Sequence, residues 1–270
     1  MPTLHMLHST QDTINTSFIL QSENATVVFD GGFPCEADYL ASYLANLGGH
    51  VDAWFFTHIH DDHLGAALDV KEKHPEIKVD RYCFNFPSVE FLNKYEPKQS
   101  VFSSEELYHR TMALTADGSV QTIVKTGDVY DFDGFSVEVL RTPVEEIANN
   151  INDTSCVYRV TVGDKILLFL GDLGVAGGRH LLANTDPGKL KADYVQMAHH
   201  GQGGVDRPVY EAIKPTYCLW CTPTWLWDNR GEGGYDTGPF RTVIVRGWMS
   251  DIGGIKKHYL MQEGDHVIAM

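Results

Sequence analysis

Basic residues, cysteines and long apolar runs are all scarce in this chain of 270 residues. Lys and Arg number 21 against 36 Asp and Glu, so the formal net charge is −15 with His neutral. This surplus of acid argues against a protein that holds DNA, RNA or an anionic membrane by a broad basic face. It leaves open a small anionic group at a metal-lined pocket, where bound cations dominate the local charge. A hydrophobic fraction of 43% excludes a largely disordered chain and provides for a large core.

The five cysteines are odd in number and mostly scattered, which favours a reduced compartment over a disulfide framework. Cys218 and Cys221 form a C-x-x-C within the apolar run YCLWC. The run has no turn residues of a zinc knuckle and a redox motif would open a helix, so we predict two buried strand thiols. No apolar run approaches the roughly 18 residues that span a bilayer, and the N-terminus does not resemble a signal peptide. We therefore predict a cytoplasmic protein.

Strand and helix patterns alternate along the whole chain. In the first half, strands are predicted over residues 17–23, 24–32, 51–60 and 81–87, and helices over 36–49, 63–75, 88–95 and 106–114. In the second half, hairpins are predicted over 128–143 and 155–172, followed by a helix near 180–185, a strand at 193–198, a helix at 208–215 and a strand at 216–221. Each half has strands followed by βα units, and no low-complexity linker separates them. We therefore predict one α/β domain over residues 1–270.

The strongest chemical signal is the string His58-Ile59-His60-Asp61-Asp62-His63, placed where a hydrophobic strand gives way to a helix. Imidazoles and carboxylates are ligands that zinc, iron and manganese accept. Residues i and i+2 of a strand share a face, so His58 and His60 can point to the same side, and the following turn can bring Asp62 and His63 to a second position. Such a dense cluster suits two metal ions better than one.

This H-x-H-x-D-H string resembles the hallmark of the metallo-β-lactamase superfamily, and the resemblance extends over nearly the whole chain. It implies a four-layer αββα sandwich and a site for two divalent metal ions, zinc foremost, with manganese or iron as alternatives. The implied metal ligands are His58, His60, Asp62, His63, Asp172 and His200. Asp172, at the end of the run ILLFLGD, would bridge both ions, and Asp30, at the end of VVFD, would orient the histidine cluster.

The chain is most similar to the competence-type (ComEC-like) branch of that superfamily. The similarity lies in the segment from Asn152 to Ser155, in His199-His200-Gly201, and in the tail at 259–270, which the resemblance implies is a closing strand pair. Many members carry a further His near the place where Asn149, Asn150 and Asn152 stand here, so the first metal would have fewer protein ligands. Asn152 is predicted to support the site.

The assignment of the adjacent histidines stays open at this point. The superfamily pattern favours His200 as the ligand, because it directly precedes Gly. Neighbouring residues at a strand end point to opposite sides, so either His could be the ligand. The other one, taken as His199, would contact the substrate, donate a proton or compensate for the missing ligand.

The ligand set predicts hydrolysis without a Ser or Cys nucleophile. Two cations bridged by Asp172 would lower the pKa of a shared water from about 15.7 toward neutrality and aim the resulting hydroxide at a bound electrophile. Asp62 would bind metal and accept a proton. The predicted substrate is a small phosphoester or phosphodiester; the alternatives are a thioester, lactone or lactam, and a metal-binding module without turnover.

Aromatic and basic residues near the C-terminus are weaker candidates for substrate contacts. Trp220, Trp225, Trp227 and Tyr235 could form an aromatic wall for a base or a quaternary ammonium group, although a place in a core strand and its loop is the favoured interpretation. Arg207 and Arg230 are candidates for contacts with an anion. The lining of the substrate pocket cannot be assigned further from the sequence.

Overall fold

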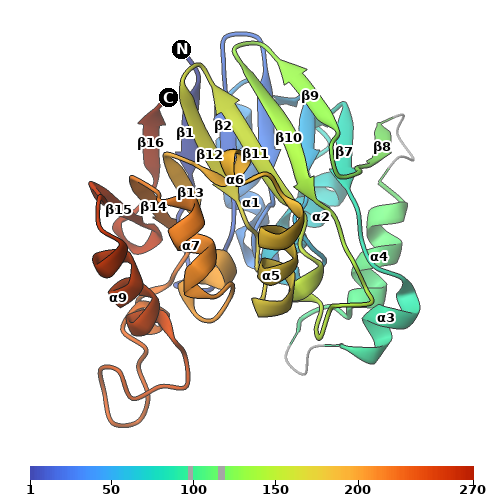
Figure 1. The fold of residues 1–270 in the computed structure, drawn as a ribbon. Coiled ribbons are helices and arrows are strands. Elements are labelled where there is room, and N and C mark those ends of the chain that lie inside the picture. The colour runs from blue at the N-terminus through green and yellow to red at the C-terminus, as the bar shows by residue number, and fades with distance from the viewer. Residues whose placement is uncertain (97–99, 115–118) are drawn as a thin grey trace.

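Two mixed β-sheets form the centre of the molecule (Figure 1). The computed structural model describes residues 1–96, 100–114 and 119–270. The first sheet has the strand order β16 (His266–Ala269), β1 (Thr3–Met6), β2 (Phe18–Gln21), β3 (Thr26–Phe29), β5 (Ala53–Phe55), β7 (Arg81–Phe84) and β8 (Val120–Ile123). The second has the order β15 (Lys257–Leu260), β14 (Tyr217–Trp220), β13 (Tyr194–Gln196), β12 (Lys165–Phe169), β11 (Val157–Val162), β10 (Phe135–Arg141) and β9 (Val129–Phe132). Strands β4 (His50–Val51) and β6 (Lys78–Val79) pair separately.

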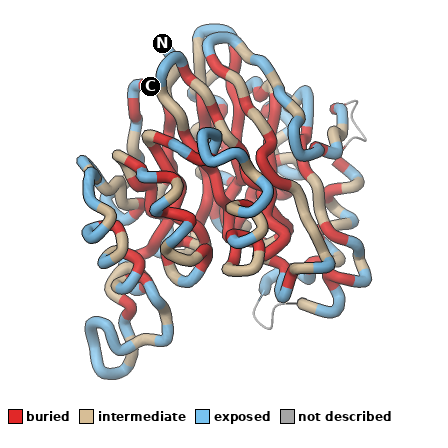
Figure 2. Tube along the Cα trace, viewed as in Figure 1, coloured by how far each residue is buried: buried red, intermediate tan, exposed pale blue. Residues whose placement is uncertain are grey.

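The side chains of the central strands alternate between two cores. In β3, Val27 and Phe29 join the core between the sheets, whereas Val28 joins the core beneath the first helix layer. In β12, Phe169 joins the same inter-sheet core and Leu168 packs beneath the second helix layer. Strands covered on both faces are apolar throughout, because successive side chains point to opposite faces. Both sheets are accordingly buried along most of their length (Figure 2).

Helices cover the outer face of each sheet and complete the predicted αββα order. The first layer contains η1 (Pro34–Glu36), α1 (Ala37–Asn46), α2 (Asp61–Lys73), α3 (Val89–Lys94) and α4 (Ser104–Met112). The second contains α5 (Val175–Asn184), α6 (Pro187–Leu190), α7 (Arg207–Ile213), α8 (Thr224–Trp227) and α9 (Thr242–Ile252). Three further 3₁₀ turns are η2 (Asn152–Thr154), η3 (Ala198–Gly201) and η4 (Met261–Glu263). In the described part of the chain, every helix is too short or too polar to cross a membrane.

Local sequence signals explain several helix ends. The Ser103 side chain accepts a hydrogen bond from the Glu106 backbone N–H and so caps the N-terminus of α4. Helix α1 buries Leu40 and Leu44 and ends at Asn46, and Gly48, just beyond the C-cap, has a φ of +109° that suits glycine. Helix α2 begins at Asp61, two residues before the predicted start. The consequence is that Asp62 and His63 belong to its first turn.

The C-terminal part of the chain corrects two expectations. The tail does not form a closing strand pair, because β15 runs parallel to β14 in the second sheet and β16 runs antiparallel to β1 in the first. Helix α9 was not predicted, since its run Thr-Val-Ile-Val is typical of a strand, but Val245 and Met249 bury one face of it against the second sheet. The single-domain organisation stays a prediction, which the core shared by both sheets supports.

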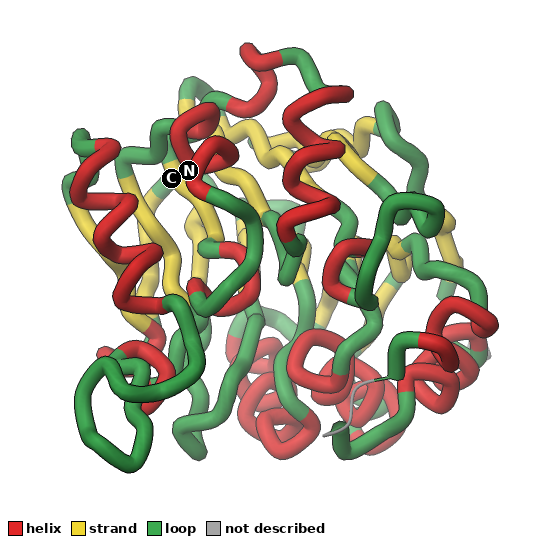
Figure 3. The backbone as a smooth tube through the Cα atoms, turned by 60° about the horizontal axis from the view of Figure 1, so that its bottom comes forward, coloured by secondary structure: helices red, strands yellow, loops and turns green. Residues whose placement is uncertain are grey.

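The carboxyl ends of several strands meet at one end of the sandwich. Strands β3 and β5 are parallel, as are β12 and β13, so the loops that follow them leave from matching edges of the two sheets. This end is the lower one in Figure 1, and Figure 3 brings it forward. It receives the histidine string, Asp172 and the His199-His200 pair.

Candidate metal centre

Two clusters of metal-ligating side chains lie at this end of the sandwich and share Asp172. The first contains His58, His60 and Asp172, and the second contains Asp62, His63, Asp172 and His200. In each cluster the ligand atoms all lie within 4.8 Å of one another. The structure therefore brings together all six residues that were predicted as metal ligands.

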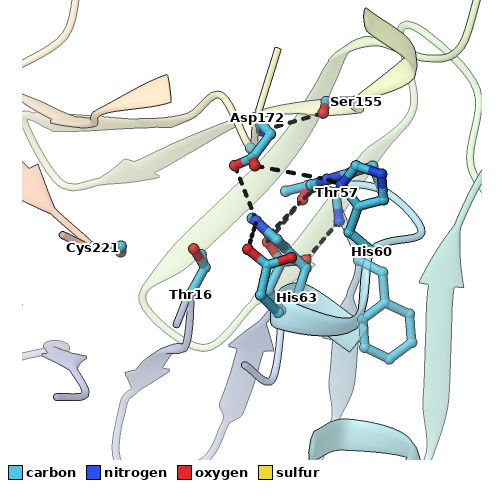
Figure 4. A network of polar contacts seen from close by, with 12 residues as sticks. Thr16, Thr57, His60, His63, Ser155, Asp172 and Cys221 are labelled. Carbon is cyan, nitrogen blue, oxygen red and sulfur yellow. Dashed lines mark hydrogen bonds and ion pairs between the residues drawn. The ribbon is translucent and has the colours of Figure 1, made fainter. Parts of the chain in front are cut away.

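Distances within the clusters are short for groups that come from three separate segments of the chain. His58 Nε2 lies 3.1 Å from His60 Nδ1 and 3.9 Å from Asp172 Oδ2. His200 Nε2 lies 2.8 Å from Asp62 Oδ2 and 3.3 Å from Asp172 Oδ2. His63 Nε2 lies 3.0 Å from Asp172 Oδ1. Asp172 thus faces imidazoles from both clusters, as a bridging ligand must (Figure 4).

Asp30 holds the histidine string from behind. Its carboxylate accepts hydrogen bonds from the Thr57 backbone N–H and hydroxyl, each at 2.8 Å, and lies 2.8 Å from His63 Nδ1. A carboxylate beside Nδ1 orients the ring, so Nε2 of His63 turns toward the cluster, where a metal ion would displace its proton and take the lone pair. Asp30 therefore lies behind His63 and contacts it directly, and its supporting role stays a prediction.

Similar contacts hold the other ligands. His200 Nδ1 lies 3.0 Å from the carbonyl oxygen of Cys221, which directs Nε2 toward Asp62 and Asp172. The backbone N–H of Asp172 donates to the Ser155 hydroxyl at 3.3 Å (Figure 4). Both Cys218 and Cys221 are buried free thiols, as predicted, and Cys221 serves the site through its backbone.

The buried carboxylates and imidazoles shift one another's pKa values. Burial alone lowers the pKa of His200, but the Asp172 and Asp62 carboxylates raise it to about 9. Burial lowers the pKa of His60 to about 4, against the opposing effect of Asp62 and Asp172. The cluster thus concentrates negative charge around the second group of ligands, where a cation would be stabilised.

Unpaired atoms test whether metal ions fit here. His60 Nε2, His63 Nε2 and Asp172 Oδ1 are buried and have no hydrogen-bond partner among the residues that the structure describes. The last two lie 3.0 Å apart, but their orientation makes no hydrogen bond. Buried polar atoms without partners are costly, and imidazole nitrogens with carboxylate oxygens are the donor set of zinc, manganese and iron. The residues fit divalent metal ions.

The His199-His200 pair adopts an unusual backbone conformation. Both residues are left-handed, each with a φ of +52°, in the turn η3 that follows β13. This conformation costs roughly 1–2 kcal/mol for a residue with a Cβ, and such strain gathers at functional sites. Because β13 ends at Gln196, the alternation expected for a strand end does not apply to this pair, and both imidazoles reach toward Asp172.

Gly171 allows the second sheet to approach the histidine string. Its φ is +54°, and a Cβ at this position would lie 2.7 Å from Thr57 Cβ. A side chain there would push Asp172 away from the string, so a glycine is required before the carboxylate that both clusters share.

A pocket of about 160 Å³ opens onto both clusters. It is lined by Ile14, Phe33, His60, Asp61, Asp62, Ser100, Asn152, Asp172 and His199. Sequence patterns missed Ile14, Phe33 and Ser100, which come from irregular loops, and Asp61, a variable position of the motif. Among the lining residues that the structure describes there is no Lys or Arg.

Other candidate features lie elsewhere. A larger cavity of about 560 Å³ opens at the opposite end of the strands beside Asp52 and Asp80, which form only an exposed cluster with His50. The chemistry of the ligands therefore identifies the site better than cavity size does. The predicted anion contacts are not in the site pocket: Arg207 pairs with Glu211 and Asp251, and Arg230 pairs with Asp228.

The proposed aromatic wall is also absent as a single surface. Trp220 is completely buried and packs edge-on against Trp227 at 5.1 Å. Trp225 and Tyr235 are exposed, at 37% and 59%. Trp220 is part of the core, so the four aromatic residues do not line one pocket.

The site geometry agrees with a family comparison. The sequence profile of the metallo-β-lactamase superfamily matches residues 10–201, which is more than half of the chain. The chain belongs to the metallo-β-lactamase superfamily. A comparison with curated protein sequences gave no significant match.

Solved structures of other proteins share the metallo-β-lactamase fold. The metallo-β-lactamase fold protein YhfI from Bacillus subtilis is 13% identical with a TM-score of 0.58, over 99% of this chain and 100% of that one. A diphosphatase from the PhnP family is 12% identical with a TM-score of 0.51, over 100% and 99%. The E377D mutant of the CmlA β-hydroxylase is 13% identical with a TM-score of 0.55, over 100% of this chain and 54% of that one. At these identities the comparison establishes the fold.

Proposed function

We propose that this chain is a metal-dependent hydrolase that uses two divalent metal ions to cleave a phosphoester or phosphodiester bond in a small substrate. The observation that carries the proposal is the pair of ligand clusters joined by Asp172. Two ions held by a shared carboxylate can clamp both the attacking and the leaving oxygen of an in-line displacement. Zinc is the proposed ion, with manganese or iron as alternatives.

The residues of the metal site and of the pocket wall have different roles in the proposed reaction. When bound, the two ions would supply Lewis-acid chemistry that polarises the scissile group and lowers the pKa of a water molecule. His63 and His200 hold their positions through Asp30 and the Cys221 carbonyl. Asp62 lies on the pocket wall, where its carboxylate accepts a proton from the attacking water. Ile14 and Phe33 supply the apolar part of the pocket wall.

The electrostatics of the pocket support a small substrate. Among the described lining residues no side chain is basic, so metal ions would supply the positive charge that binds a phosphate. The similar structure of a diphosphatase is a further point in favour of phosphate chemistry. A long polyanion would instead meet a protein of net charge −15.

A thioester, lactone or lactam is the second candidate substrate. The observation in its favour is the same lining of apolar and acidic side chains, because an uncharged carbonyl substrate needs no basic residue. The competence-type branch stays our proposed position within the superfamily, on the motifs of the sequence. The absence of a disulfide among the five free cysteines supports the proposed cytoplasmic location.

Elemental analysis and a substrate panel test the proposal. We expect about two equivalents of zinc, manganese or iron in metal-replete protein, as two clusters require. A chromogenic panel of phosphodiester, phosphomonoester, thioester and lactone should give turnover of a phosphate ester. Asp62→Ala should lower kcat by about 10²–10⁴-fold, the range for loss of a positioned acid or base.

A matched control is available on the same helix. Asp69 lies in α2 away from the pocket, so Asp69→Asn should keep normal turnover. Less than half an equivalent of metal would rule out the binuclear mechanism. If only the thioester is turned over and Asp62→Ala abolishes that activity, the phosphoester proposal is wrong and the second candidate substrate class replaces it. Two equivalents of metal without turnover of any substrate in the panel would favour the third hypothesis, a metal-binding module that is not an enzyme.

A further inference from the structure

The His199-His200 pair has an unequal relation to the two metal clusters. The second cluster contains four residues, Asp62, His63, Asp172 and His200, whereas the first contains only His58, His60 and Asp172. We propose that His199 is the fourth protein ligand of the first metal ion, so that two adjacent histidines bind different ions. This inference rests on the proposed binuclear site and deepens it.

Backbone geometry brings the two imidazoles to the same side. Adjacent residues of an extended chain point in opposite directions, but His199 and His200 both have a φ of +52°. The His199 backbone N–H donates to the carbonyl oxygen of Gly171 at 3.0 Å, which fastens the turn beside the bridging carboxylate. A strained turn of this kind is expected where both side chains have work to do.

Asp172 Oδ2 is the common neighbour of three imidazoles. It lies 3.8 Å from His199 Nε2, 3.9 Å from His58 Nε2 and 3.3 Å from His200 Nε2. His199 is thus as near to the bridging carboxylate as His58, which is a member of the first cluster. Its side chain, 28% exposed, lies in the pocket wall together with His60.

The side chain of Asn152 contacts Nε2 of His199, the nitrogen that would bind the metal. Its Nδ2 lies 3.2 Å from His199 Nε2, and because an amide nitrogen only donates, Nε2 accepts with its lone pair. A metal ion would take the same lone pair, so Asn152 must release it on metal binding. Asn152 Oδ1 is buried and has no hydrogen-bond partner in the described part of the chain, so Oδ1 does not hold the amide in this orientation. His199 is therefore outside the compact cluster but presents the correct atom toward it.

Metal binding by variants tests the proposal without a substrate. Metal-free protein is titrated with Zn²⁺ or Co²⁺ against a chelating indicator, and bound metal is counted by elemental analysis. Wild type should bind two equivalents. His199→Ala should keep one equivalent at wild-type affinity and bind the second about 10–100-fold more weakly or worse. His109→Ala, on the exposed face of α4, is the control and should bind two.

Double variants identify which ion is lost. His58→Ala with His199→Ala should still keep one equivalent, because both residues belong to the first site. His200→Ala with His199→Ala should bind neither ion tightly. If His199→Ala binds two equivalents with wild-type affinity, His199 is not a ligand and the proposal is overturned.

A spectroscopic variant covers the case in which the alanine disturbs the turn. His199→Cys loaded with Co²⁺ should show a thiolate-to-cobalt charge-transfer band in the near ultraviolet, absent from wild type and from His109→Cys. Absence of the band overturns the proposal even if His199→Ala loses both ions. Two ions in wild type without turnover of any phosphate ester would refute the proposed function and leave this inference standing.

Discussion

Asp30 controls the candidate site although it lies outside the pocket. It is almost completely buried, at 1% exposure, directly after β3, and its own φ is +54°. Burial raises the pKa of the Asp30 carboxyl, while His63 and Thr57 act to lower it. A buried carboxylate is retained where it has work to do, because removing it from water is costly. At Asp30 that work is to orient His63.

Asp30→Asn should weaken the second metal ion specifically. The amide keeps the size of the side chain and can still accept from the Thr57 N–H, but it loses the negative charge beside His63 Nδ1. Loss of such a supporting contact typically costs about 10–100-fold in metal affinity. Competition with a chelator measures this, with Asp69→Asn as the control. Unchanged affinity for both ions would show that Asp30 only stabilises the fold.

Helices α2 and α4 are joined by an ion-pair network at the scale of elements. Asp69 of α2 lies 2.7 Å from Lys73 Nζ and 2.7 Å from Arg110 Nη2, and Arg110 also meets Glu72 at 2.9 Å. The side chain of Asp69 is only 9% exposed, so these pairs are partly shielded from water. The network fixes α4 against the helix that carries Asp62 and His63.

The contribution of Asp69 should depend on pH. Burial alone would raise the pKa of Asp69, but Lys73 and Arg110 lower it below the ordinary value. The stabilisation is therefore complete above the unfolded-state pKa of about 3.9 and is lost as pH falls through the lower folded-state pKa. Asp69→Asn should cost about 1 kcal/mol in free energy of unfolding at pH 7, and progressively less as the pH falls below about 3.9. Urea unfolding of metal-free protein at several pH values measures this.

The control for this prediction is a carboxylate outside the network. Glu105→Gln changes an exposed residue of α4 whose neighbour is His109, at 3.7 Å. At every pH of the same range its free energy of unfolding should stay close to the wild-type value. A cost for Asp69→Asn that does not vary with pH would mean that packing, not charge, joins the two helices.

Elements were predictable wherever the local pattern agreed with the packing. The hairpins predicted over 128–143 and 155–172 are the antiparallel pairs β9–β10 and β11–β12, with turns at Asp133-Gly134 and Gly163-Asp164. All six predicted metal ligands come together, because each follows a strand whose carboxyl end reaches the same edge. The position of a metal site can therefore be predicted from the residues that follow parallel strands, because the loops after these strands lie at one end of the sheet.

Other features depend on contacts that no local pattern encodes. The strand-like run of α9 becomes a helix because Val245 and Met249 pack on the second sheet. Strands β15 and β16 part to different sheets, and their partners are distant in sequence. The His199-His200 turn needs the Gly171 carbonyl to hold it, so a rule for strand ends misjudged its direction. Residues of irregular loops that line the pocket cannot be predicted from local patterns for the same reason.

The whole molecule is acidic, and its charge decides which substrates it can approach. The formal net charge is −15, and two divalent ions would reduce its magnitude only to 11. Several of its arginines are already paired with carboxylates, including Arg110, Arg179, Arg207 and Arg230. A small phosphate ester needs only the local field of the metal ions, whereas a polynucleotide must cross the repulsive field of the whole surface.

Salt should therefore affect polynucleotides in an unusual direction. Proteins with a basic track lose affinity for nucleic acid as salt rises. Here the interaction is repulsive, so kcat/KM for a single-stranded oligonucleotide should rise when the Debye length shortens from about 30 Å at 0.01 M to about 10 Å at 0.1 M ionic strength. A small chromogenic phosphodiester, assayed in parallel, should change much less because it carries one charge. A fall in kcat/KM for the oligonucleotide over this range would reveal a local basic track and make long nucleic acids the better candidate substrate.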